Sequence, residues 1–390
     1  MRARALRGCL LLLLALMHSA TAAKHNDDED SAPRYTPTPP VLYPGDVRNF
    51  RDVTFAELQG YRPLTLDLYL PPRGGAPKPA VVFIHGGAWR SRTPRDGGAF
   101  RDFPAILASV AARNYVVASV SYRFSGEAHF PAAVQDVALA IRWLRQHAAQ
   151  YGIDTHRLVV WGSSAGGQIA ALLGTACGVS IFQPPAPADA KAPLPSTCVQ
   201  GVIDWYGLVD LEMDGRDLDK PAVPDYVNTY LGCTLPNGSP PTKAPATTMP
   251  PINVLATTVP PATVQPTTVQ PTTIPTTAAP PTTAPWNSSP VATPCPAGWA
   301  RSASPFPYID AKAPPFLIQH GAADITVSPT QSKRLYEALH AAGVPAELVI
   351  YPGVAHGFAK APGGGPDDAV NKQAMDKVFE YLARYFPTGK

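Results

Sequence analysis

A serine between two glycines, directly after an apolar run, most constrains the fold of this chain. Residues 162–166 read Gly-Ser-Ser-Ala-Gly and follow the apolar residues 158–161. The apolar run predicts a buried strand, and the glycines predict a sharp turn into a helix, because a side chain at either glycine would collide with neighbouring backbone. Ser164 is the serine in frame, since a motif centred on Ser163 would place Trp161 at the first glycine position. We therefore expect Ser164 at a strand-to-helix turn, where a nucleophile can be exposed.

Short β-branched runs alternate with segments of helical periodicity along most of the chain. We expect strands over residues 65–70, 81–85, 115–121, 158–162, 199–206, 316–320 and 347–351. Apolar residues recur at helical spacing over residues 131–150, 329–342 and 367–385. Such alternation is typical of the α/β class, in which helices flank a mostly parallel central sheet.

The first 22 residues have the composition of a secretory signal peptide. Three arginines precede an apolar stretch at residues 9–17, and residues 20–22 match a small-x-small cleavage pattern. The apolar stretch is shorter than the ~20 residues that span a bilayer, and no second run of this kind follows. We therefore expect residues 1–22 to be removed, leaving a secreted chain of residues 23–390, extracellular or periplasmic, with no membrane anchor.

The charge of the chain gives no indication of a polyanionic partner. The formal net charge is +3, and loss of the three arginines in residues 1–22 gives 3 − 3 = 0. The acidic run at residues 27–30 is typical of a solvated tail. We therefore expect no nucleic-acid partner, and the sequence does not predict an oligomeric state.

Four cysteines remain after residue 22, namely Cys177, Cys198, Cys233 and Cys295. An even number in an exported chain suggests two disulfides, for which three pairings exist. We expect sequence neighbours to pair, Cys177 with Cys198 and Cys233 with Cys295. The alternative is one bridge and two buried thiols.

Residues 237–297 interrupt the α/β pattern with a segment dense in Pro and Thr. Such a composition cannot bury a core, so we expect an extended, disordered and solvated insertion within the domain that spans residues 23–390. The repeats lack the amphipathic apolar face of a lid that responds to lipid surfaces, which favours a spacer or a glycan carrier. A bridge between Cys233 and Cys295 would join the two ends of this insertion.

A nucleophilic serine needs a base and an orienting acid, and both have candidates in the chain order Ser, Asp, His. Asp324 follows the strand expected at residues 316–320, and His356 follows the last expected strand. Catalytic groups gather at the carboxyl edge of an open parallel sheet, so we expect Ser164, Asp324 and His356 to meet there. Rival acids are Asp210 above all, then Asp204 and Asp310.

An oxyanion needs hydrogen-bond donors, and the turn after the strand at residues 81–85 can supply them. This turn reads Gly86-Gly87-Ala88, where small side chains leave the backbone amides unobstructed. We expect the Gly87 amide, with Gly86 or Ala88 as its companion, to act together with the amide of Ala165. His85, directly before this turn, is expected to be a structural residue and not the base.

No metal or cofactor is expected. The sequence has no C-x-x-C or H-x-x-x-H grouping of metal ligands. The glycines at residues 363–365 lack the lysine and the helix start of a phosphate-binding loop.

Taken together, these motifs resemble the α/β-hydrolase superfamily. The chain is similar in particular to hormone-sensitive-lipase-like esterases and to the bacterial branch that includes feruloyl and acetylxylan esterases. The segments that carry the resemblance are residues 85–89, 121–123, 130–133, 143–145, 151–154, 161–167, 315–321, 331–332 and 356–358. The resemblance implies a serine esterase that acts on short or aromatic acyl esters, either small molecules or esters linked to plant cell-wall polysaccharide.

Two other interpretations stay open. Serine peptidases of the prolyl-oligopeptidase type share this catalytic arrangement, but they usually carry a large propeller domain, and only about 40 residues separate residue 22 from the first expected strand. An inactive hydrolase fold that serves as a binding protein is the second. Such proteins generally lose the serine or the histidine, whereas this chain has both.

Overall fold

The computed structural model describes residues 39–186, 193–212, 224–235, 293–360 and 364–388. Contacts divide the chain into Met1–Pro39 and Pro40–Lys390, and the fold below is that of the second unit. The expected signal peptide and residues 237–292 of the expected insertion lie outside the described residues.

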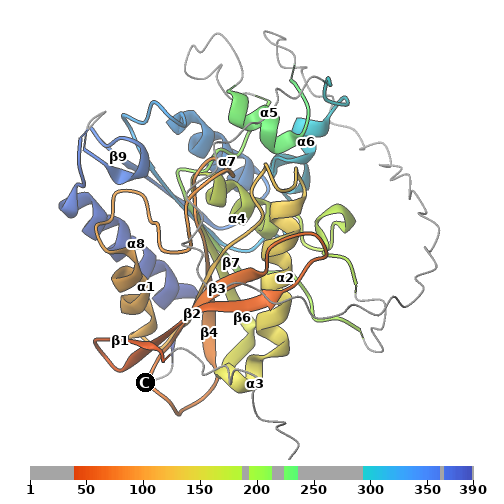
Figure 1. Cartoon of the computed structure of the whole chain (residues 1–390). Coiled ribbons are helices and arrows are strands. Elements are labelled where there is room, and N and C mark those ends of the chain that lie inside the picture. The colour runs from red at the N-terminus through yellow and green to blue at the C-terminus, as the bar shows by residue number, and fades with distance from the viewer. Residues whose placement is uncertain (1–38, 187–192, 213–223, 236–292, 361–363, 389–390) are drawn as a thin grey trace, which may run out of the picture. The chain divides into compact units, whose positions relative to one another are not determined.

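One sheet organises the second unit, with strand order β1-β2-β3-β5-β4-β6-β7-β8-β9 (Figure 1). The strands from β5 to β9 in this order are parallel, whereas β1, β2 and β3 pair antiparallel and β3 is antiparallel to β5. The strand bounds are β1 Val41–Tyr43, β2 Val47–Ala56, β3 Leu64–Leu70, β4 Lys78–Ile84, β5 Val116–Val120, β6 Ile153–Ser163, β7 Gly201–Trp205, β8 Phe316–Gly321 and β9 Ala346–Tyr351.

Helices cover both faces of this sheet (Figure 1). Side chains of α1 and α8 pack on one face, and those of α2, α4 and α7 pack on the other. The helix bounds are α1 Phe103–Ala111, α2 Ala132–Gln146, α3 Ala148–Tyr151, α4 Ala165–Thr175, α5 Asp225–Leu231, α6 Trp299–Ser302, α7 Pro329–Ala341 and α8 Asp368–Tyr385. Short 3-10 turns occur at Ser180–Phe182, Phe306–Tyr308 and His356–Phe358.

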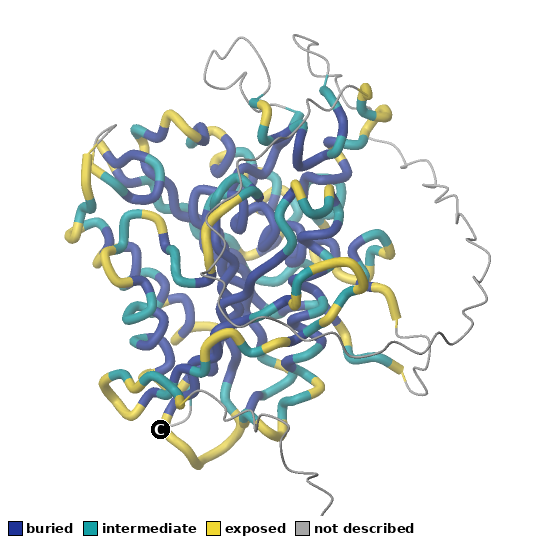
Figure 2. Tube along the Cα trace, in the orientation of Figure 1, coloured by how far each residue is buried: buried dark blue, intermediate teal, exposed yellow. Residues whose placement is uncertain are grey.

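The core lies along the central strands, where Figure 2 shows buried residues concentrated, whereas exposed residues lie in loops, on outer helix faces and on the edge strands β1 and β2. On the α1/α8 face, Trp161 packs edge-to-face on Trp205, with ring centroids 4.6 Å apart. Phe83 and Phe103 meet at 4.5 Å beside them. Aromatic pairs in this geometry add about 1 kcal/mol each to the energy of burial, so the strands that carry the site are rigidly held.

The expected fold class is confirmed, as are all seven expected strands within a few residues of their bounds. The sequence pattern missed β1 and β2. β1 is very short, and the alternation of β2 is broken by a bulge between Phe50 and Val53. The helix expected over residues 131–150 is divided, because α2 ends at Gln146 and α3 follows.

Both expected disulfides are confirmed, Cys177–Cys198 and Cys233–Cys295. The second bridge spans 62 residues of sequence. Backbone hydrogen bonds lie beside it, from Thr234 N to Thr293 O and from Cys295 N to Thr234 O. Closing a loop of this length stabilises a fold by about 4 kcal/mol in the chain-entropy description. The bridge therefore ties the two segments that flank residues 236–292 to each other.

The parallel strands bring four loops to one edge of the sheet. The register aligns Ile84 of β4 with Gly162 of β6, and Gly162 with Asp204 of β7. On the far side of β7, Gly321 of β8 aligns with Tyr351 of β9. The loops that leave β4, β6, β8 and β9 all start at this carboxyl edge, which is where open α/β sheets place their functional groups.

Candidate active site

Ser164 lies on a tight turn between β6 and α4. Its backbone has φ 55° and ψ −116°, a left-handed conformation that is rare for a residue with a side chain. A Cβ on Gly162 would collide with the backbone of Gly166, and one on Gly166 would collide with the carbonyl of Ile84. The two glycines let β6, α4 and β4 approach closely enough to present the Ser164 hydroxyl at the sheet edge.

Ser164, His356 and Asp324 form one continuous hydrogen-bonded chain. Ser164 Oγ is 3.0 Å from His356 Nε2, although the two residues are 192 positions apart in sequence. His356 Nδ1 is 2.6 Å from Asp324 Oδ2. A carboxylate can only accept, so Nδ1 carries the proton and Nε2 is left to accept one from the serine hydroxyl. The structure thus brings together the three side chains that the sequence predicted would meet.

Asp324 is buried and held as a carboxylate by four donors. Its Oδ1 accepts the backbone amides of Thr326 at 2.8 Å and Val327 at 3.0 Å. Its Oδ2 faces both His356 and His320. Burial by itself would raise the pKa of Asp324, but the hydrogen bonds from His320 and His356 outweigh it and hold the pKa well below its usual range. The Asp324 carboxyl is therefore ionised near pH 7.

His320 contacts the same carboxylate as His356, which the sequence did not reveal. Its Nε2 lies 3.2 Å from Asp324 Oδ2 and 3.0 Å from Val327 O. Its Nδ1 is 2.7 Å from Ser332 Oγ on α7. Both groups beside Nε2 are acceptors, so Nε2 carries the proton and Ser332 donates to Nδ1. In the sequence, the only indication of this contact is that His320 lies near the end of β8, four residues before Asp324.

The rival acids point elsewhere. Asp210 pairs with Arg334 on α7 at 2.6 Å. Asp310 is exposed and accepts the backbone amide of Lys312. Asp204 is fully buried beneath the turn, where its Oδ1 accepts the amide of Gly207. Among the carboxylates that the structure describes, Asp324 alone is hydrogen-bonded to His356.

Asp204 supports a prediction about stability. Burial raises its pKa to about 7, and its Oδ2 has no hydrogen-bond partner among the described residues. Above pH 7 the folded state therefore contains a buried charge that the unfolded chain exposes, whereas below pH 4 both states are neutral. The Asp204→Asn variant should gain stability over the wild type as pH rises from about 4 to about 7, by at most about 4 kcal/mol. Urea denaturation at pH 5 and pH 8 measures this, and an equal difference at both values would contradict it.

The turn after β4 presents Gly86 and Gly87 beside the serine. A Cβ on Gly86 would lie 2.9 Å from the Ser163 carbonyl oxygen and 3.2 Å from the Ser164 Cβ, so a glycine lets this turn pass close to the serine turn. Gly87 has φ +109°, and a Cβ there would collide with the carbonyl of Ser91. Among the described residues, the amides of Gly87 and Ala165 donate to no backbone carbonyl. Neither amide is thus satisfied by the surrounding backbone.

Buried aromatic packing holds this turn in place. Trp89 stacks on Tyr230 of α5 with ring centroids 4.1 Å apart, and its Nε1 donates to Gln168 Oε1 of α4 at 3.1 Å. His85 is fully buried, stacks on Tyr122, and donates from Nδ1 to the carbonyl of Gly86. Burial lowers the pKa of His85 to about 4, so the ring is neutral near pH 7. These contacts fix the positions of the glycine amides.

A cavity of about 490 Å³ opens above the serine. Its wall includes Gly86, Gly87, Ser164, Tyr206 and His356. The Tyr206 ring meets the His356 ring edge-to-face at 4.8 Å and supports the imidazole from one side. This volume lies within the usual range for a small-molecule site.

Among the residues that the structure describes, no group of three or more His, Cys, Asp or Glu side chains is arranged to hold a metal ion. None of the helices described is both long and apolar enough to cross a membrane.

A serine on a strained strand-to-helix turn, at the carboxyl edge of a mostly parallel sheet and hydrogen-bonded to a histidine from the last strand's loop, defines an α/β-hydrolase. Comparison with protein-family models agrees. The BD-FAE model matches residues 66–275, and the model of the dienelactone hydrolase family matches residues 300–386. The first match covers more than half of the chain, so the chain belongs to the BD-FAE family. The resemblance stated from the sequence motifs is thus confirmed.

Curated relatives include two esterases of Mycobacterium tuberculosis. Carboxylesterase NlhH is 34% identical over 140 residues, which are 36% of this chain and 41% of that protein. Esterase LipC is 26% identical over 314 residues, which are 79% of this chain and 60% of that protein. The chain therefore spans less than two thirds of the length of these relatives.

Solved structures share the fold. Esterase 2 of Thermogutta terrifontis in its butyrate-bound form superposes with a TM-score of 0.57 and 24% identity, over 86% of this chain and 95% of that one. The sarin-phosphonylated form of the same esterase has the same TM-score at 23% identity, over 90% of this chain. At this identity the likeness establishes the fold.

Proposed function

We propose that this chain is a secreted serine carboxylesterase that hydrolyses short acyl esters through an acyl-enzyme. In this proposal Ser164 is the nucleophile, His356 the general base and Asp324 the acid that orients the imidazole. The observation that carries the proposal is the hydrogen-bonded chain from Asp324 through His356 to Ser164 at the floor of an open cavity. A serine hydroxyl is a weak nucleophile unless a base beside it accepts its proton.

The proposed reaction has two steps, acylation of Ser164 and hydrolysis of the acyl-enzyme. His356 Nε2 takes the hydroxyl proton as Ser164 Oγ bonds to the ester carbonyl carbon, and the resulting oxyanion collapses as the bond to the alcohol breaks. The imidazolium returns its proton to the departing alcohol. Water then attacks the acyl carbon while His356 Nε2 accepts a proton from it. The imidazolium returns that proton to Ser164 Oγ as the bond between Oγ and the acyl carbon breaks, so the carboxylic acid leaves and the free serine is restored.

The amides of Gly87 and Ala165, with Gly86 beside them, bind the oxyanion in this mechanism. Each such donor typically contributes about 100- to 1000-fold to turnover, because it is aimed in advance at the charge that develops. The buried packing of Trp89 supports this role, since it leaves the turn little freedom to move away.

The relatives guide the choice of acyl group. Those compared above are described as carboxylesterases or esterases, and structures of the Thermogutta esterase hold propionate and butyrate. The cavity above Ser164 has a volume of about 490 Å³, and Arg90 and Arg92 are part of its wall. It therefore suits an acyl group of the size of propionate or butyrate better than a long alkyl chain. Two disulfides suit an oxidising compartment, which supports export and a substrate outside the cell such as an acylated polysaccharide.

A substrate panel tests the proposal. We expect p-nitrophenyl acetate and butyrate to be hydrolysed at least about tenfold more efficiently, in kcat/KM, than p-nitrophenyl palmitate, because the longer chain exceeds the cavity. Aminoacyl-p-nitroanilides should be left intact, and acetylated xylan or methyl ferulate tests the polysaccharide and aromatic extensions. Cleavage of the anilides in preference to the esters would replace the esterase with a peptidase.

A further inference from the structure

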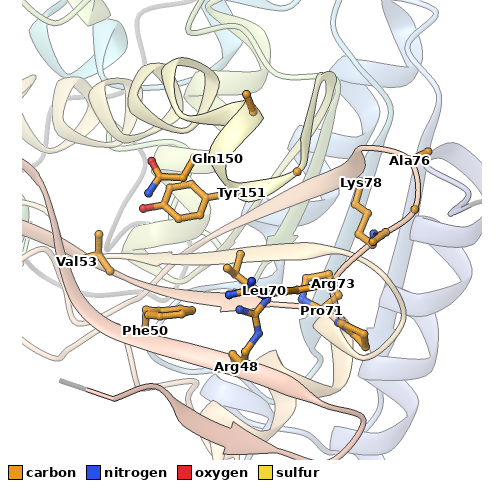
Figure 3. Close-up of a pocket in the computed structure, with 15 residues that line it drawn as sticks. Arg48, Phe50, Val53, Leu70, Pro71, Arg73, Ala76, Lys78, Gln150 and Tyr151 are labelled. Carbon is orange, nitrogen blue, oxygen red and sulfur yellow. Dashed lines mark hydrogen bonds between the residues drawn. The ribbon is translucent and has the colours of Figure 1, made fainter. Parts of the chain in front are cut away.

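A second cavity, of about 580 Å³, lies at the opposite edge of the sheet (Figure 3). It is bounded by β2, by the loop that joins β3 to β4, and by α3 with the glycine that follows it. Lys78 at the start of β4 aligns with Ile153 at the start of β6, which places the cavity at the amino ends of these strands. β4 advances roughly 3.3 Å per residue, so the cavity is about 20 Å from the serine edge.

The charges that line this cavity are all positive. Arg48, Arg73 and Lys78 contribute to its wall, and no Asp or Glu does. Figure 3 shows the side chains of Arg48 and Arg73 approaching each other beside Leu70. Neither guanidinium forms a hydrogen bond or an ion pair with a residue that the structure describes. Two like charges are therefore held together without a counter-charge.

This arrangement lowers the pKa of the Arg48 guanidinium. The larger cause is burial of Arg48, and the smaller cause is the nearby positive charge of Arg73. Arg95, in contrast, binds the carboxylates of Asp67 and Asp52. Arg48 and Arg73 have no such acid beside them among the described residues, and a bound anion would supply the missing counter-charge.

The loop between β3 and β4 keeps the cavity open. Lys78 Nζ donates to the carbonyl of Gly74 at 2.6 Å, which folds the loop back over the start of β4. Gly74 has φ +99°, and no atom lies within 4 Å of a Cβ built on it, so that side of the loop faces open space.

Aromatic and amide side chains complete the wall. Phe50 of β2 lies beneath the Arg48 guanidinium, whose carbon is 5.9 Å from the ring centroid. Tyr151 and Gln150 line the cavity from α3 and lie across it from Phe50 in Figure 3. An aromatic face with an amide beside it suits a polar ring of the size of a sugar. The arginine pair suits an acidic group carried by the same ligand.

We propose that this cavity binds a sugar-sized organic anion, with its oxyanion between Arg48 and Arg73 and its ring between Phe50 and Tyr151. Two sources share this chemistry, namely the uronic acids of polysaccharides and phosphorylated sugars. The site does not include Ser164 and does not depend on the esterase activity proposed above.

Isothermal titration calorimetry at low salt tests the proposal with D-glucuronate, D-glucose 6-phosphate and neutral D-glucose. We expect both anions to bind at one site per chain and glucose not to bind measurably. The Arg48→Gln/Arg73→Gln variant should weaken both anions at least tenfold, and Arg73→Gln alone, at an exposed position, should weaken them in the same direction. The anion that binds with the lower Kd identifies whether the ligand is a uronic acid or a phosphorylated sugar.

Arg51→Gln is the matched control, because Arg51 is an exposed arginine of the same strand that does not line the cavity. It should leave both affinities within about twofold, and thermal unfolding of each variant verifies that it is folded. The proposal is overturned if neither anion binds saturably, if glucose binds as well as glucuronate, or if Arg51→Gln weakens binding as much as Arg73→Gln does. None of these outcomes bears on hydrolysis at Ser164.

Discussion

Replacement of Ser164 by alanine is expected to lower kcat for p-nitrophenyl acetate about a million-fold, to the residual level that binding and oxyanion donors provide. The physical reason is the loss of the only atom that could bond to the acyl carbon. His356 Nε2 would lose its hydrogen-bond partner at 3.0 Å but keep its contact with Asp324. Steady-state kinetics and labelling by a fluorophosphonate probe measure this.

Ser163→Ala is the matched control for this change. Ser163 is the neighbouring residue and is buried, whereas His356 is hydrogen-bonded to Ser164. We expect the control variant to keep its activity within about tenfold and to be labelled by the probe. If Ser164→Ala retained turnover while Ser163→Ala lost it, the frame of the motif would be wrong and the proposed mechanism would fail with it.

Asp324→Asn should lower kcat about ten-thousand-fold while leaving KM nearly unchanged. An amide would present a donor or an uncharged oxygen to His356 Nδ1, so the ring would lose both its fixed tautomer and the charge that stabilises the imidazolium. The loss of turnover should be larger because Asp324 Oδ2 accepts from both His320 and His356, so the substitution disturbs both imidazoles. Kinetics of the purified variant with p-nitrophenyl acetate measure it.

Asp210→Asn is the control that separates the two candidate acids. Asp210 pairs with Arg334 of α7, and the change should affect stability more than turnover. We expect its kcat to stay within about threefold of wild type. A large loss at Asp210 with little loss at Asp324 would transfer the role of the acid to Asp210.

Several features of the fold and the site could be predicted because they are local in sequence. The turn around Ser164 depends on glycines at fixed spacing, and buried parallel strands appear as continuous apolar runs. β2 could not be predicted in this way, since its alternation is interrupted by a bulge. The sequence favoured Asp324 over three rival acids from its place after a strand, and the contact between its carboxylate and His356 could be observed only in the folded chain.

The sequence by itself determined the α/β pattern, the serine turn and the order of the candidate catalytic residues along the chain. Only the tertiary structure decided which cysteines pair, that His320 shares the carboxylate of Asp324 with His356, and that Arg48 and Arg73 meet without a counter-charge. The reason is physical. Secondary structure follows from neighbours along the backbone, whereas a hydrogen bond across 192 residues depends on strand order and register, which the packing of the whole sheet establishes.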